Sequence, residues 1–256
     1  WEWSFGLMRD AALLTLQLLK EGLEWGMILK DATPYNIQWH KGKLVFIDSL
    51  SFEKYDEQKP WIAYRQFCEH FVAPLALASY GTAESLRALR AYLDGLPLAE
   101  AVALMPGRAR FRRGLAMHLY LHAASRKKYD AKDVGSAKAR QVSRLAMTGL
   151  VSSLERTVRK LNLPRRVTQW GKYYGDTNYS GAGFTSKKKI VNGYLSDIRP
   201  RPRLVWDIGA NDGTFSELAA AAGAYVVSFD TDTVAIERNF AKPRDANLAD
   251  LILPAI

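Results

Sequence analysis

The chain has 256 residues, a formal net charge of +10, 48% hydrophobic and 24% charged residues, values typical of a globular protein with one or two domains. Its one cysteine, Cys68, excludes an internal disulfide and fits a reducing compartment, so we expect a cytoplasmic protein with this thiol buried in a helix. No run of 18 apolar residues occurs, which excludes a membrane-spanning helix, and we expect no membrane partner.

The first 165 residues predict a mainly helical region. The expected helices are 5–26, 60–80, 83–94, 97–104, 113–126 and about 133–161, and the expected strands are 37–40 and 44–47. Gly26 should end the first helix, and Lys41-Gly42-Lys43 should join the two strands in a hairpin. Pro74 should kink or divide the aromatic-rich helix 60–80, because proline lacks the backbone N–H that a helix needs.

The excess positive charge lies in the middle of the sequence. Residues 107–172 contain 17 Lys and Arg against 3 Asp and Glu, a net charge of +14, so the rest of the chain is slightly acidic. Such a basic stripe can bind nucleic acid or another anionic surface. It can equally be a solvated helix face, or a surface that meets acidic neighbours of another domain.

The character of the sequence changes near Leu163-Pro164. Residues 168–187 are rich in Tyr, Gly, Ser and Thr and predict a linker or a binding loop. The elements expected after it are a helix at 187–197, a strand at 203–207, a helix at 214–222, a strand at 225–230, a helix at 233–240 and a strand at 248–253. This alternation predicts an α/β region with a parallel sheet.

The most informative motif begins in the strand at 203–207. The sequence Leu204-Val-Trp-Asp-Ile-Gly-Ala-Asn-Asp-Gly-Thr214 places an acid at the strand end and then a Gly-x-x-x-Gly turn before a helix. Glycine lets the backbone approach a ligand closely, and a helix N-terminus offers free N–H donors. The next strand ends in Asp230, 21 residues after Gly209, where an acid can accept hydrogen bonds from ribose hydroxyls. A glycine turn that only packs the strand against the helix is the structural alternative.

That pattern suits NAD as well as S-adenosylmethionine (SAM), and the charges favour SAM. A pyrophosphate would be repelled by Asp207 and Asp212, whereas a sulfonium with an ammonium group would not. The stretch resembles the first motif of class I SAM-dependent methyltransferases, and Ser228-Phe-Asp-Thr-Asp232 resembles their ribose-binding motif. The resemblance implies that Asp207 lies near the methionine ammonium, that the turn with Gly209, Asn211 and Gly213 admits the cofactor, that Asp230 holds the ribose, and that Thr231 and Asp232 flank the adenine.

A second motif lies near the N-terminus. Asp31-x-x-x-x-Asn36, a hairpin and then Asp48 at a strand end resemble the catalytic loop and metal-binding aspartate of protein-kinase-like and aminoglycoside-phosphotransferase-like folds. The resemblance implies that Asp31 would orient a hydroxyl, and that Asn36 and Asp48 would hold Mg²⁺. The sequence departs from that pattern, since Leu29 stands in place of His and Ser49-Leu50 in place of Phe-Gly. The readings left open are a truncated enzyme, an inactive kinase-like scaffold, and plain turn caps.

No set of metal ligands stands out elsewhere. Arg65, Glu69 and His70 share one face of the helix 60–80, and we expect a polar network there instead of a metal site.

The order of the motifs resembles a family of SAM-dependent methyltransferases related to the nodulation protein NoeA. The matching stretches are WEWSF, RDAALLTL, LKDATPYNIQW, VFIDSLSFE, PWIAYRQFCEHFVAPLALA and VWDIGANDGTFS. The resemblance implies a kinase-C-lobe-like helical region at 1–165 and, at 166–256, the first three parallel strands of a Rossmann-like methyltransferase domain. We expect both ends to continue in the complete protein, because the chain begins at Trp1 and stops at Ile256 within an apolar run.

The function expected for the complete protein is SAM-dependent methyl transfer to an unknown acceptor. The residues that align the acceptor usually follow the fourth strand of such domains, so no catalytic residue is assigned and residues 1–256 alone are expected to be inactive. One alternative is a Mg-ATP-dependent phosphotransferase, or an inactive scaffold, using Asp31, Asn36 and Asp48. The other is an RNA- or anion-binding module that uses the basic stripe at 107–172.

Overall fold

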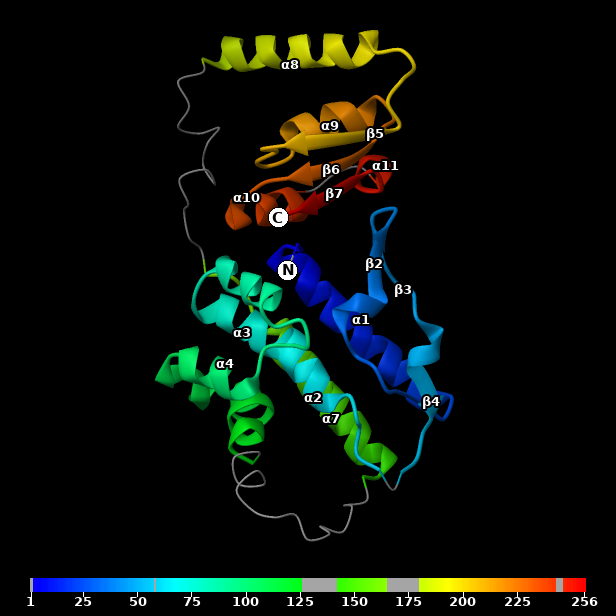
Figure 1. Ribbon diagram of the computed structural model, residues 1–256, viewed down its shortest axis with the longest axis vertical. Coiled ribbons are helices and arrows are strands. Elements are labelled where there is room, and N and C mark those ends of the chain that lie inside the picture. Colours follow the sequence, from blue (N-terminus) through cyan, green and yellow to red (C-terminus); the bar gives the residue numbers. More distant parts are fainter. Residues whose placement is uncertain (1, 58, 126–141, 165–179, 243–245) are drawn as a thin grey trace. The chain divides into compact units, whose positions relative to one another are not determined.

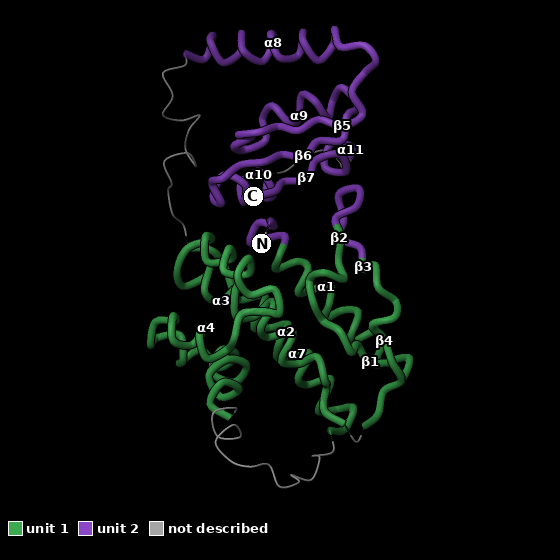
Figure 2. The backbone as a smooth tube through the Cα atoms, in the orientation of Figure 1, with its two compact units in different colours: residues 1, 8–38, 46–164 green, residues 2–7, 39–45, 165–256 purple. Residues whose placement is uncertain are grey.

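A computed structural model describes residues 2–57, 59–125, 142–164, 180–242 and 246–256 of the chain, which has a mixed α/β architecture (Figure 1). The chain divides into two compact units (Figure 2). The N-terminal unit contains residues 8–38 and 46–164, and the C-terminal unit contains residues 2–7, 39–45 and 165–256. The assignment of the two parts as kinase-like and methyltransferase-like stays a prediction.

The elements of the first 164 residues are mostly helical. The α-helices are α1 (Phe5–Glu24), α2 (Tyr64–Phe67), α3 (Ala73–Tyr80), α4 (Leu98–Leu104), α5 (Arg113–Leu115) and α7 (Arg144–Arg159). The strands are β1 (Met27–Leu29), β2 (Ile37–His40), β3 (Lys43–Phe46) and β4 (Phe52–Lys54), paired as β1 with β4 and β2 with β3. The predicted first helix and hairpin are therefore confirmed within one or two residues.

The helical run 64–80 shows how the chain accommodates Pro74. It is not divided: α2 passes into a π-helical turn, η3 (Cys68–Val72), and then into α3, whose second residue is Pro74. The N–H of Ala73 bonds to the carbonyl of Cys68, five residues back, and the N–H of Leu96 donates to the carbonyl of Glu69 at 3.0 Å. The wider turn and a donor from a neighbouring loop thus replace the hydrogen bonds that proline disturbs.

Three other helix predictions need correction. Residues 83–90 form a 3₁₀ helix, η4 (Ala83–Arg90), because the buried residues Ala83, Leu86 and Leu89 repeat every three residues, which matches the 3₁₀ period. The helix expected at 113–126 is α5, then a π-helix η6 (Ala116–Leu121), then helical residues up to 125. The helix expected at 133–161 is α7, which begins at Arg144. The Ser143 hydroxyl caps it there by accepting a hydrogen bond from Ala146 N–H, and residues 133–141 lie outside the described residues.

Three short 3₁₀ turns complete this part: η1 (Pro34–Asn36), η2 (Ser49–Ser51) and η5 (Gly107–Phe111).

The core of the N-terminal unit lies around the helical run 64–80. Its largest fully buried side chains are Met8, Leu16, Leu19, Leu29, Phe67, Phe71, Leu75, Leu86, Leu96, Leu119 and Met147. Cys68 is also fully buried, as expected, and burial raises the pKa of its thiol. Trp61 fixes the start of this run, because its indole N–H donates to the carbonyl of Leu29 at 2.6 Å.

A buried polar cluster joins three helical segments of the N-terminal unit. The Tyr64 hydroxyl lies 2.8 Å from His118 Nδ1, and His118 Nε2 lies 3.0 Å from the Ser153 hydroxyl. The His118 side chain is fully buried, and His122 stacks on the Tyr64 ring at a centroid distance of 4.8 Å. Burial, with a smaller contribution from His122, lowers the pKa of His118 from 6.5 to about 4.

The C-terminal unit is built on a parallel sheet, as predicted. Strands β5 (Leu204–Ile208), β6 (Tyr225–Phe229) and β7 (Ile252–Ala255) lie in the order β5-β6-β7, and the helices are α8 (Gly181–Asp197), α9 (Thr214–Ala221), α10 (Thr233–Ala241) and α11 (Ala246–Ala249). One face of the sheet is covered: Val226 and Ile252 pack with Ala219 and Ala220 of α9, and Leu195 of α8 adjoins this core. On the other face of β5, Leu204, Trp206 and Ile208 are exposed.

Two predictions for this unit were wrong in extent. Residues 181–187 are the first turns of α8 and not a linker, because the Ser180 hydroxyl caps the helix by accepting the N–H of Gly183. The remainder of that predicted linker up to 179 lies outside the described residues. The last strand begins at Ile252 instead of 248, since α11 occupies 246–249.

Candidate functional site at the carboxyl ends of β5 and β6

The glycine turn follows β5 and closes against the end of β6. Gly209 N–H and Ala210 N–H both donate to the carbonyl of Phe229 at 2.9 Å. Gly209 and Gly213 have φ values of +81° and +75°, in the left-handed region that glycine adopts without strain. No atom lies within 4 Å of the position that a Cβ at Gly209 would take, so the backbone there is open to a ligand.

Asp230 connects the glycine turn after β5 with the turn after β6. Its Oδ2 accepts the backbone N–H of Asn211 at 2.8 Å, and its Oδ1 accepts the N–H of Asp232 at 2.8 Å. Asp232 in turn caps α10 by accepting the N–H groups of Val234 and Ala235. The two strand ends are thus connected through one carboxylate, with Thr231 exposed beside it.

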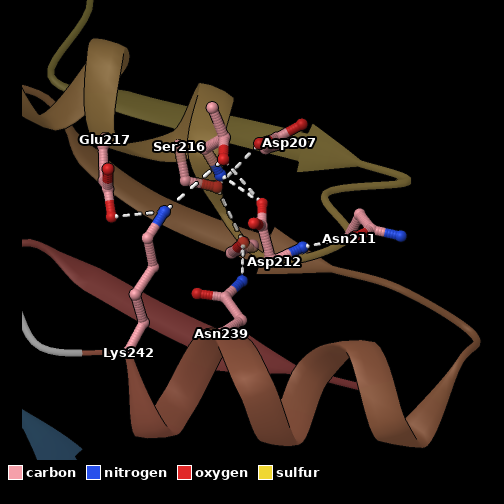
Figure 3. A network of polar contacts seen from close by, with 9 residues as sticks. Asp207, Asn211, Asp212, Ser216, Glu217, Asn239 and Lys242 are labelled. Atoms are coloured by element: carbon pink, nitrogen blue, oxygen red, sulfur yellow. Dashed lines mark hydrogen bonds and ion pairs between the residues drawn. The ribbon is translucent and has the colours of Figure 1, made fainter. Parts of the chain in front are cut away.

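Asp212 belongs to the start of α9. Its Oδ1 accepts the backbone N–H of Thr214 at 3.1 Å and the Thr214 hydroxyl at 2.7 Å, and its own N–H donates to the Asn211 side chain. The Nζ atom of Lys242 also lies near the start of α9, 3.4 Å from the Thr214 hydroxyl and 3.0 Å from the carboxylate of Glu217 (Figure 3). The carboxylate of Asp212 is therefore engaged in capping.

Asp207, the last acid before the turn, faces inward. Its Oδ2 accepts a hydrogen bond of 2.6 Å from the Ser216 hydroxyl, the first link of a polar network that continues to Ser228 and Asn239 (Figure 3). Burial raises the pKa of Asp207, and Asp230 raises it further, while the Ser216 hydroxyl and N–H and the charge of Lys187 lower it. The sequence motifs assign no role to Ser216, Ser228 or Asn239, because a local pattern does not show which buried polar side chains meet.

The predicted cofactor residues therefore gather at one edge of the sheet. Those at or next to the carboxyl ends of β5 and β6 are Asp207, Gly209, Asn211, Gly213, Asp230, Thr231 and Asp232. This edge, where parallel strands end and helices begin, is where open α/β sheets bind their ligands.

The residues of the second predicted site make hydrogen bonds within and between two turns. Asp31 Oδ1 accepts the N–H of Thr33 at 3.0 Å, and Asp48 accepts both the N–H of Leu50 and the hydroxyl of Ser51. The side chain of buried Asn36 donates to the same Ser51 hydroxyl at 3.1 Å. The structure thus joins Asn36 and Asp48 through Ser51, and Asp31 and Asp48 also cap turns by accepting backbone N–H groups two residues ahead.

Of the polar network expected on the helical run 64–80, the structure shows the pair Arg65 and Glu69. Arg65 Nε lies 2.9 Å from Glu69 Oε1, and the ring of His70 makes an edge contact with Tyr35. Burial lowers the pKa of His70, against opposing effects of Asp31 and Asp94. Among the described residues, no group of three or more His, Cys, Asp or Glu side chains could hold a metal ion. Within the same part of the chain, no helix combines the length and apolarity needed to cross a bilayer.

Comparison with known proteins identifies one relative. No family model and no solved structure matches the chain. The chain is 32% identical over 245 residues to the nodulation protein NoeA of Rhizobium meliloti (strain 1021), an alignment that covers 94% of this chain and 51% of NoeA. The chain thus spans about half the length of this curated relative. Because the similarity extends along nearly all of this chain, it supports the prediction of a NoeA-related family.

Proposed function

We propose that the C-terminal unit binds S-adenosylmethionine and forms part of a methyltransferase. The observation that carries the proposal is the pair of carboxyl groups, Asp207 and Asp230, at the ends of adjacent parallel strands around a glycine turn. In this assignment the bound cofactor supplies an electrophilic methyl group, and the protein holds it in line with the acceptor.

The charges at this edge suit a cationic ligand. Asp207 and Asp230 are close enough for Asp230 to raise the pKa of Asp207, so a ligand ammonium or sulfonium placed near them would relieve that repulsion. The phosphates of a dinucleotide would add to the repulsion. Each oxygen of Asp230 accepts one backbone N–H and retains a lone pair for a ribose hydroxyl.

Calorimetric titration of S-adenosylhomocysteine, NAD and Mg-ATP into the 256-residue chain tests this proposal. We expect S-adenosylhomocysteine alone to bind, and Asp230→Ala to weaken it about tenfold or more, because hydrogen bonds to a carboxylate are worth about 1.5–3 kcal/mol each. Asp197→Ala, at the exposed end of α8, is the matched control and should bind as the wild type does. Binding of NAD in preference to S-adenosylhomocysteine would refute the assignment.

A second function is favoured by the surface around η5, and we propose it separately. Four arginines in residues 108–113 (Arg108, Arg110, Arg112 and Arg113) are exposed, and the sequence has no Asp or Glu from 101 to 129. Phe111 among them is 76% exposed, with the Arg110 guanidinium 5.0 Å from its ring centroid. Exposed aromatic and guanidinium planes beside positive charge are what single-stranded RNA stacks on and pairs with.

Fluorescence anisotropy with a single-stranded RNA oligonucleotide, over a range of salt concentrations, measures this activity. The double change Arg110→Gln, Arg112→Gln should reduce the magnitude of the log–log salt slope by about 1.4, since each phosphate contact on a single strand contributes about 0.7. Phe111→Ala should weaken binding with the slope unchanged, because stacking releases no counterions. Arg201→Gln, exposed in the C-terminal unit, is the control. Binding that does not depend on salt would contradict the proposal.

A further inference from the structure

A buried chain of polar side chains runs from α10 to the carboxylate of Asp207. Asn239 Nδ2 lies 2.7 Å from the Ser228 hydroxyl, which lies 2.7 Å from the Ser216 hydroxyl, which lies 2.6 Å from Asp207 Oδ2 (Figure 3). Ser216, Ser228 and Asn239, hereafter the inner polar chain, are all fully buried. The members come from three elements, α9, β6 and α10.

The backbone explains why these side chains meet. The parallel register pairs Asp207 of β5 with Ser228 of β6, so both side chains lie on the same face of the sheet. Val226, two residues before Ser228, packs on that face against Ala219 and Ala220 of α9. Ser216 in the first turns of α9 therefore reaches both strands, and Asn239 of α10 reaches Ser228 beside it.

The direction of each hydrogen bond follows from the chemistry of the groups. An ionised carboxylate only accepts, so the single hydroxyl hydrogen of Ser216 is directed to Asp207. The Ser216 oxygen must then receive the hydrogen of Ser228, and the Ser228 oxygen receives an N–H of Asn239. One donor hydrogen of each residue in the inner polar chain is thereby directed toward Asp207, and bonds aligned in this way polarise one another.

This arrangement acts on the charge and the orientation of Asp207. The carboxyl is half-buried, and the charged groups that act on it are Asp230 after β6, which opposes ionisation, and Lys187 of α8, which favours it. The Ser216 hydroxyl favours the ionised form, and the donors behind it strengthen that hydrogen bond. The Ser216 hydroxyl holds Oδ2 inward, so Oδ1 is the oxygen that this hydroxyl leaves for a cationic ligand.

We propose that Asn239 and Ser228 are positioning residues for Asp207, which act through Ser216 to keep its carboxylate ionised and its second oxygen available to a cationic group of the ligand. This inference rests on the proposed function, in which that group is the ammonium of S-adenosylmethionine. It adds to the site three residues to which the sequence motifs assign no role and that do not themselves touch the ligand.

Two measurements on the 256-residue chain test this inference. A ¹³C NMR titration follows the protonation of the Asp207 carboxyl directly, and calorimetric titration at neutral and mildly acidic pH measures the affinity for S-adenosylhomocysteine. Ser216→Ala should move the titration of Asp207 to higher pH most strongly, Ser228→Ala less, and Asn239→Leu, which removes only the last donor, least but in the same direction. The affinity for S-adenosylhomocysteine should fall in the same order, by about tenfold for Ser216→Ala. Ser196→Ala and Asn192→Leu, both exposed on α8, are the matched controls and should change neither reading.

Chemical denaturation of each variant at pH 7 separates loss of folding from loss of positioning, since a general loosening of the core does not produce a graded change in one carboxyl titration. An Asp207 titration that is unchanged in Ser228→Ala and Asn239→Leu would overturn the inference, even if S-adenosylhomocysteine binds. If no variant and no wild-type chain binds S-adenosylhomocysteine while the NMR titrations shift in the stated order, the positioning stands and the proposed cofactor is wrong.

Discussion

Gly114→Ala is expected to destabilise the N-terminal unit by about 2–3 kcal/mol, the cost of overpacking a tightly packed contact. A Cβ at Gly114 would overlap the hydroxyl oxygen of Thr157 and would lie 2.8 Å from its Cγ2 and 2.9 Å from its Cβ. Thr157 cannot easily move away, because it is buried in α7 and its hydroxyl donates to the carbonyl of Ser153 at 2.7 Å. Urea denaturation followed by circular dichroism measures the change.

The sequence offers a matched control for this change. Gly149 lies in the middle of α7, is exposed, and has no atom within 4 Å of an added Cβ. Gly149→Ala should therefore stabilise the protein by about 0.5–1 kcal/mol, the helix propensity difference. Thr157→Ala should destabilise the wild type but recover part of the loss in Gly114→Ala. If the two substitutions simply add, the contact between α5 and α7 is not the cause.

Acidification from pH 7 to pH 4 should cost the N-terminal unit about 3 kcal/mol through His118 alone. Burial lowers the pKa of His118 to about 4 in the folded state, against 6.5 in the unfolded chain. Above pH 6.5 the ring is neutral in both states and stability is unaffected. Between about pH 6.5 and pH 4 the unfolded chain binds a proton at His118 that the folded protein does not bind, so the free energy of unfolding decreases as the pH is lowered. Below about pH 4 the folded protein binds this proton as well, and the loss levels off.

Comparison of unfolding free energies at pH 7 and pH 4 in the wild type and in His118→Gln isolates this contribution. The variant should be less stable at pH 7, because it disturbs the bonds to Tyr64 and Ser153, yet lose about 3 kcal/mol less on acidification. His70, whose pKa burial also lowers, remains in both proteins and cancels in the difference. Equal losses in the two proteins would show that His118 is not the group that titrates.

Local patterns in the sequence predicted most elements of the C-terminal unit. Alternating apolar strands and helices predicted a parallel sheet of β5, β6 and β7, and the acids at two strand ends predicted Asp207 and Asp230 at one edge of it. The register that pairs Asp207 with Ser228 is a long-range property, and no local pattern reports it. For that reason the acids were found and the residues behind Asp207 were not.

The helix at 83–94 was predicted wrongly for a similar reason. The apolar spacing of Ala83, Leu86 and Leu89 is compatible with an α-helix and a 3₁₀ helix, and tertiary packing decides between them. The motif of Asp31, Asn36 and Asp48 stays a prediction: the spacing identifies the residue types, and in the structure their side chains bond to Thr33, Leu50 and Ser51. Spacing identifies residue types that could perform chemistry, and only the contacts show how they are used.

The π-helical turn before Pro74 has a consequence for the motions of the N-terminal unit. From Phe67 to Ala78 every side chain is buried, so this helix has no solvent-facing side along which it could fray. Hydrogen exchange of its amides then requires the surrounding core to open, which makes local opening and global unfolding the same event there. The backbone amides of η5 and of the exposed arginines at 107–113 can exchange while this helix stays folded. The unit thus combines a slowly exchanging centre with a quickly exchanging surface.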